Sequence, residues 1–112
     1  MLDHEKMDVY ECSVEFLELA MEAQEEIPRG FGDVRNQLRK AAVSIPLNIA
    51  EGVGKSSGKD RRKYYEIARG SAHECGAIWD TLDILGSLEE GEYSEGKELV
   101  TRIVSMLCKL CS

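Results

Sequence analysis

The sequence of 112 residues contains no long run of apolar residues. A helix that spans a bilayer needs about 18 or more consecutive apolar residues, so we expect no membrane segment. A basic start is also missing, because the first 26 residues carry nine acidic side chains. A secretory signal begins with basic residues and continues with an apolar stretch, so the sequence favours a cytoplasmic protein.

Motifs of catalysis and of metal binding are scarce as well. There are only two histidines, and the segment GVGKSSGKD lacks the glycine spacing and the preceding strand of a phosphate-binding loop. Cys108 and Cys111 have the spacing of a metal or redox pair, but no second pair accompanies them and both fit an apolar helix face. We therefore expect reduced cysteines packed as small apolar groups, no metal, no cofactor and no enzymatic activity.

The net charge of −7 is distributed unevenly along the chain. Residues 1–28 hold nine acids and one base, and residues 70–112 hold eight acids and three bases. Residues 29–69 between them hold ten bases and four acids. The middle of an acidic protein is thus basic, and its overall isoelectric point says little about its partners.

Apolar residues recur at steps of three and four along segments that are separated by turn residues, which is the pattern of amphipathic helices. No segment has the alternation of a strand. The spacing predicts an all-α chain of one domain, residues 1–112, folded as an antiparallel up-down four-helix bundle. The expected helices cover about residues 2–26, 33–53 and 57–85, followed by a last helix that ends near residue 111.

The second of these helices contains a proline. Asp33 is its expected N-cap, and Ser57 or Asp60 is the expected N-cap of the third helix. Pro46 removes a backbone donor and crowds the carbonyl of Ala42, at a cost of about 3 kcal/mol in a regular helix. We therefore expect the second helix to be kinked at Pro46.

Polar residues surround this proline on an otherwise apolar run. They can pair with backbone groups that the kink frees, with Arg39, or with polar residues of the third helix. We expect a structural cluster that fixes the register of the two helices rather than an acid–base pair, since no nucleophile stands at a recognisable spacing. The predicted cluster consists of Ser44, Asn48, Glu51, Ser71 and Glu74.

Most bases of the middle segment lie on the second and third helices and in the loop between them. They are either partners of the acids that follow one face of the first helix, or a phosphate-binding surface with Tyr64 or Tyr65 nearby to stack on bases. Both interpretations remain open from the sequence. The basic set consists of Arg35, Arg39, Lys40, Lys55, Lys59, Arg61, Arg62 and Lys63.

The helices carry two neighbouring apolar rows, which is wider than a four-helix core requires. The second row either thickens the core or forms a seam for self-association. In the third helix, Gly70 and Gly76 indicate a close approach of another backbone, because glycine otherwise weakens a helix.

The segment QLRKAAVSIPLNIAEGVGK, residues 37–55, resembles the signature of a four-helix-bundle family, the proteins encoded by intervening sequences in bacterial 23S ribosomal RNA genes. The segment YYEIARGSAHE, residues 64–74, resembles the part that follows it. The resemblance implies an antiparallel bundle assembled as a homo-oligomer, with a pentamer favoured. It also implies kinship with the accessory variability protein of diversity-generating retroelements, a basic pentamer that binds a reverse transcriptase and nucleic acid.

These features together predict a non-catalytic oligomeric adaptor or scaffold. Its basic region, residues 35–69, would bind a protein partner and nucleic acid, either RNA or DNA. The alternative is a structural or regulatory homo-oligomer that has no nucleic-acid role.

Overall fold

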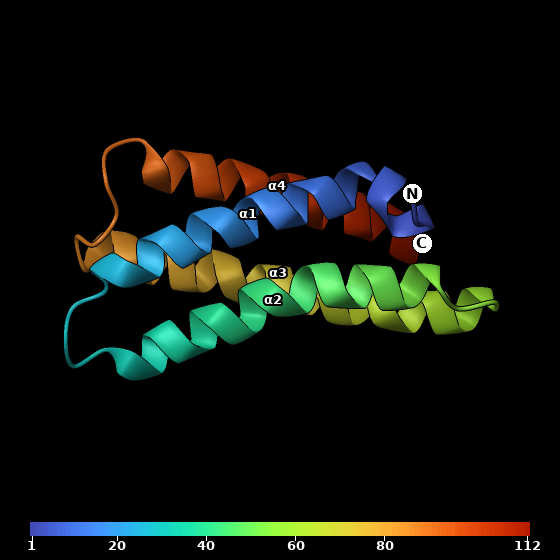
Figure 1. Ribbon diagram of the computed structural model, residues 1–112, viewed down its shortest axis with the longest axis horizontal. Helices are drawn as coiled ribbons and strands as arrows, with labels where there is room; N and C mark the ends of the chain where they lie inside the picture. Colours follow the sequence, from blue (N-terminus) through green and yellow to red (C-terminus); the bar gives the residue numbers. More distant parts are fainter.

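The computed structural model describes residues 1–112 as four helices without strands. Figure 1 shows an antiparallel bundle, with both termini and the α2–α3 turn at one end and the other two connections at the opposite end. Each helix packs against its neighbours in the chain and α1 packs against α4, so α1 and α3 lie diagonally. This arrangement confirms the predicted bundle. The helices are α1 (Asp8–Ala23), α2 (Gly32–Val53), α3 (Gly58–Ile84) and α4 (Glu92–Cys111), with the short 3-10 helices η1 (Asp3–Lys6) and η2 (Gln24–Glu26).

The first helix is shorter than the predicted range 2–26. Its regular part begins at Asp8 because Met7 is extended, with φ −90° and ψ 130°. Before it lies η1, where the ring of His4 packs edge-on against Tyr10 with the centroids 4.7 Å apart. The prediction of one continuous helix is wrong at both ends, since apolar spacing does not distinguish an α-helix from 3-10 turns that continue it.

One of the two predicted helix caps is correct. Ser57 is the N-cap of α3, and its hydroxyl accepts a hydrogen bond from the backbone N–H of Asp60 at 3.1 Å. Asp33 is not the N-cap of α2, because the helix already begins at residue 32 and Phe31 precedes it. Asp33 instead lies in the first turn, where a negative charge is favoured by the positive end of the helix dipole.

Pro46 lies buried inside α2, and the helix continues through it to Val53. In Figure 1 the teal first half of α2 runs obliquely to the bundle, and the green second half runs alongside α3. The helix therefore changes direction near its middle. A bend at this place agrees with the predicted kink, because proline lacks the backbone donor that would reach the carbonyl of Ala42.

We expect Pro46→Ala to change the free energy of unfolding by less than the roughly 3 kcal/mol that a proline costs in a regular helix, because the bend is already built into the packing. Urea unfolding followed by circular dichroism measures this change. Pro28→Ala, in the exposed α1–α2 turn, controls for the loss of proline rigidity in the unfolded chain. If Pro46→Ala raised the free energy of unfolding by about 3 kcal/mol or more, the packing would not accommodate the proline.

The centre of the core is Trp79 of α3, which is fully buried. Its ring packs edge-on against Phe16 of α1 with the centroids 5.2 Å apart, and its Nε1–H donates to the carbonyl of Tyr93 at 3.1 Å. Because both the ring and its polar atom have partners, the indole is fixed in place. It therefore links α1, α3 and α4 within one cluster of buried side chains.

Close approaches to glycine occur at Gly52 and Gly96 rather than at the predicted Gly70 and Gly76. A Cβ on Gly96 would overlap the indole of Trp79, whereas a Cβ on Gly70 would meet nothing within 4 Å. A Cβ on Gly76 would make only an ordinary contact at 3.5 Å. The prediction is wrong because the groups that approach are aromatic rings from a neighbouring helix, and the sequence around a glycine does not reveal them.

The second apolar row mostly thickens the core, since most of its residues are buried or half-buried against it. Only three large apolar side chains in helix interiors are exposed: Val43 at 39%, Leu47 at 63% and Ile67 at 43%. The other exposed ones lie at helix ends or outside helices. None of the four helices combines the length and apolar character that crossing a membrane requires.

Candidate functional site

The basic set does not form one surface, and two of its members have structural roles. The guanidinium of Arg35 donates to the carbonyl of Gln24 at 3.2 Å and to that of Ile27 at 2.8 Å. The guanidinium of Arg61 donates to the carbonyl of Lys55 at 3.0 Å. These contacts satisfy backbone groups at the first residue of η2, just after η2, and in the α2–α3 turn, so neither side chain is free for a phosphate.

Lys55 is also engaged within the chain. Its Nζ lies 3.1 Å from a carboxylate oxygen of Glu51, and this hydrogen bond raises the pKa of Lys55. The same Nζ lies 5.2 Å from the ring centroid of Tyr64, and that of Lys63 lies 5.6 Å from it. Tyr65 is buried, so of the two tyrosines predicted to stack on bases only Tyr64 reaches the surface.

Three bases at the start of α3 are exposed and have no ion-pair partner: Lys59, Arg62 and Lys63. They occupy the first two turns of the helix, where the helix dipole adds partial positive charge. Asp60 and Glu66 lie among them around a shallow hollow without forming an ion pair. We call Lys59, Arg62 and Lys63 the turn cluster.

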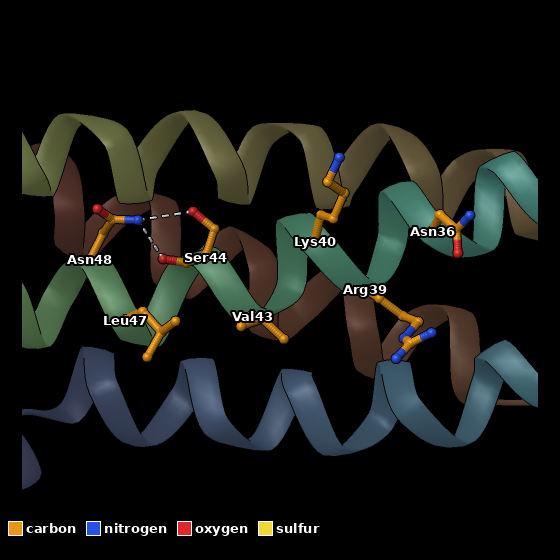
Figure 2. Close-up of a pocket in the computed structure, with 7 residues that line it drawn as sticks. All are labelled: Asn36, Arg39, Lys40, Val43, Ser44, Leu47 and Asn48. Atoms are coloured by element: carbon orange, nitrogen blue, oxygen red, sulfur yellow. Dashed lines mark hydrogen bonds between the residues drawn. The ribbon is translucent and has the colours of Figure 1, made fainter.

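Arg39 and Lys40 lie on a different surface, about 20 Å along α2 from the α2–α3 turn. With Val43 and Leu47 they line a groove on the outward side of α2. Figure 2 shows Arg39 pointing towards α1 and Lys40 towards α3. We call these four residues the α2 face. Its apolar members were not predicted, although their spacing of four residues, outside the buried series of α2, indicates a second stripe.

The structure brings together three of the residues predicted for the polar cluster. The side-chain amide of Asn48 donates to the carbonyl and the hydroxyl of Ser44 at 2.8 and 2.9 Å, as Figure 2 shows. The hydroxyl of Ser71 on α3 donates to that of Ser44 at 2.8 Å. Glu51 and Glu74 are exposed and lie outside the cluster, so the prediction is wrong for both. A carboxylate in this seam would lose its water without gaining a cationic partner.

We expect Asn48→Leu to lower the free energy of unfolding by about 1–2 kcal/mol, because it removes two hydrogen bonds from half-buried groups of Ser44. Glu51→Leu is the matched control, since Glu51 belongs to the same helix but forms only an exposed ion pair. We expect it to change stability by less than about 0.5 kcal/mol. Urea unfolding compares the two variants. Equal effects would show that the cluster does not stabilise the α2–α3 seam.

The acidic face of α1 also has no partner within the chain. The three ion pairs of the protein are Lys6–Asp3, Lys55–Glu51 and Lys97–Asp80. Pairing between the basic set and the acids of α1 therefore does not occur inside one chain. The acidic ribbon, as we call it, consists of the exposed acids of this face, Asp8, Glu11, Glu15, Glu18 and Glu22, and of Glu25, which follows in η2.

A family model of the 23S rRNA-intervening sequence protein matches residues 5–109. The chain belongs to this family. The match spans all four helices and agrees with the resemblance noted in residues 37–55. No protein of curated function is similar to the chain.

A solved structure shares the bundle of this chain. A protein of unknown function from the S23 ribosomal protein family of Bacteroides thetaiotaomicron superposes with a TM-score of 0.83. The superposition covers 93% of this chain and 98% of that chain at 20% sequence identity. At this level of identity the similarity supports the fold.

The four cysteines of the chain are all free thiols. Burial raises the pKa of Cys75 to about 12 and also raises the pKa of Cys12 and Cys111. These three thiols stay protonated and pack in the core, as predicted. The prediction is wrong for Cys108, which is exposed on α4 with its sulfur 3.9 Å from a guanidinium nitrogen of Arg69.

Proposed function

We propose that this protein is a non-catalytic homo-oligomeric scaffold of the cytoplasm that binds single-stranded RNA through the turn cluster. The observation that carries the proposal is that Lys59, Arg62 and Lys63 are exposed, adjacent and free of ion pairs in a protein that is acidic overall. A cluster of this kind suits a polyanion, because each phosphate that it contacts releases a condensed counterion.

Two further features support RNA as the partner. The half-buried ring of Tyr64 lies beside the turn cluster, where a base can stack against its exposed part. The resemblance to the accessory variability protein of diversity-generating retroelements, which binds nucleic acid and a reverse transcriptase, favours the same partner class. It also favours a pentamer as the assembly and a protein as an additional partner.

The acidic ribbon would repel RNA if it lay beside the turn cluster. The two are on α1 and α3, which are diagonal in the bundle and meet in its core, where Phe16 packs against Trp79. At physiological salt the Debye length is about 8 Å, so charges on opposite sides of the bundle are largely screened from each other. A local basic surface can therefore bind a polyanion despite the net charge of −7.

The experiment is a titration of fluorescent single-stranded RNA with the wild-type protein, followed by anisotropy at low and at physiological salt. Three phosphate contacts predict a slope of about −2 in log K against log salt, from about 0.7 for each contact. A DNA strand of the same sequence tests the preference for RNA. If neither strand binds at either salt concentration, the nucleic-acid part of the proposal is wrong.

The alternative is a structural or regulatory homo-oligomer without a nucleic-acid role. The unpaired acidic ribbon favours it, because the turn cluster of one copy could then pair with the ribbon of another. Under this alternative, reversing the charge of the turn cluster changes the mass of the assembly, and RNA does not bind at all.

A further inference from the structure

The α2 face is exposed to water although half of it is apolar. Val43 and Leu47 are 39% and 63% exposed in the middle of a helix of 22 residues. Exposed apolar side chains one turn apart and rimmed by polar groups are typical of an interaction surface. Arg39 and Lys40 lie beside them, exposed and without an acid within ion-pair distance. A partner for this face therefore needs an apolar stripe with negative charges.

One stripe of α1 has this composition. It reads Glu11, Val14, Glu18 and Met21, with steps of three and four, so these side chains lie along one side of α1, and Glu25 follows in η2. The three glutamates are exposed, and Val14 and Met21 between them are half-buried. Acidic and apolar side chains thus alternate here, whereas the α2 face combines basic and apolar ones.

We propose that the α2 face of one copy docks on this stripe of α1 in a second copy. The α1 helix of the same chain does not supply the charge partners, since none of its acids pairs with Arg39 or Lys40. Every copy carries both surfaces, so a second copy presents the complementary one. This inference rests on the homo-oligomer part of the proposed function.

The apolar and the charged side chains have separate roles in this contact. Burial of Val43 and Leu47 against Val14 and Met21 removes apolar area from water, which supplies the attraction. Opposite charges at the rim orient the two copies, because other docking positions would bring like charges together. The contact does not use the turn cluster: along α2, the α2–α3 turn lies about 10 Å from Leu47 and about 20 Å from Arg39, so the assembled protein keeps that surface free for RNA.

The experiment is a measurement of mass by light scattering at physiological salt, combined with charge reversal. We expect the wild type to exceed the monomer mass of 12.5 kDa. The variant R39E/K40E and the variant E11K/E18K should each fall to 12.5 kDa. An equimolar mixture of the two should regain a larger mass, because the reversed surfaces are again complementary.

Two further variants keep the test specific. K59E/R62E changes the charge by the same amount at the turn cluster, and its mass should equal that of the wild type. V43S/L47S removes the apolar part of the α2 face without changing charge, and it should shift the assembly towards the monomer. All substituted side chains are exposed, so thermal melts followed by circular dichroism should show a folded bundle for every variant.

The outcomes separate this inference from the proposed function. A wild type of 12.5 kDa would overturn both the docking and the assembly part of the proposed function. A larger wild type whose mass is unchanged in R39E/K40E and V43S/L47S would overturn the docking alone. Failure of RNA to bind would leave all of these masses as expected and would count only against the RNA proposal.

Discussion

Gly96→Ala is expected to lower the free energy of unfolding by about 3 kcal/mol, because a methyl group at this position has no space. The new Cβ would overlap Nε1 and Cε2 of Trp79 and lie 2.6 Å from its Cζ2. The indole cannot move aside, since it is fully buried, packs against Phe16 and donates to the carbonyl of Tyr93. For a domain of this size the loss corresponds to a fall of about 12 °C in melting temperature.

Gly76→Ala is the matched control, because Gly76 is also a buried glycine in a helix interior. Its Cβ would meet only a methyl carbon of Val100 at 3.5 Å, an ordinary contact. We expect a gain of up to about 1 kcal/mol from the higher helix propensity of alanine. Thermal and urea unfolding of both variants tests the packing around Trp79. If Gly96→Ala were as stable as the wild type, the indole would not be fixed as described.

The second large effect is expected at the turn cluster. Replacing Lys59, Arg62 and Lys63 together with glutamine should abolish RNA binding at physiological salt, because the substitution removes every unpaired cation of this surface. At low salt any remaining binding should show a slope of log K against log salt that is smaller by about 2, or about 0.7 for each lost contact. Anisotropy with fluorescent RNA measures both quantities.

The control for this variant replaces three exposed bases elsewhere, Lys6, Arg29 and Arg102, with glutamine. It changes the net charge by the same amount. We expect its affinity for RNA to stay close to that of the wild type, since binding depends on local rather than net charge. Equal losses in the two variants would contradict a defined site and indicate a general effect of charge.

Much of the fold follows from the spacing of apolar residues. The rows through Phe16, Ile45 and Trp79 place these side chains in the core, and the turn residues separate the helices. Ser57 is recognisable as a cap because its hydroxyl has a local partner three residues later. The extended backbone at Met7 is not predictable from the spacing, because it depends on how the η1 segment packs against α1.

The candidate site is less predictable, because the role of a base depends on what the fold places beside it. Arg35 and Arg61 look like Lys59 and Arg62 in the sequence, yet the first two bind backbone carbonyls. The polar cluster was predictable for Asn48 and its serine neighbours, which are small enough to pair inside the seam. Helical spacing alone does not show which of two apolar rows stays exposed, so the α2 face requires the structure.

The central claim is that the turn cluster serves RNA while a different surface serves assembly. Light scattering of the wild type at physiological salt, with and without single-stranded RNA, tests this claim most directly. We predict that the protein mass of the assembly is the same in both cases and that bound RNA adds to the total mass. A fall in protein mass when RNA is added would contradict the claim, because RNA would then compete with a second copy for the turn cluster.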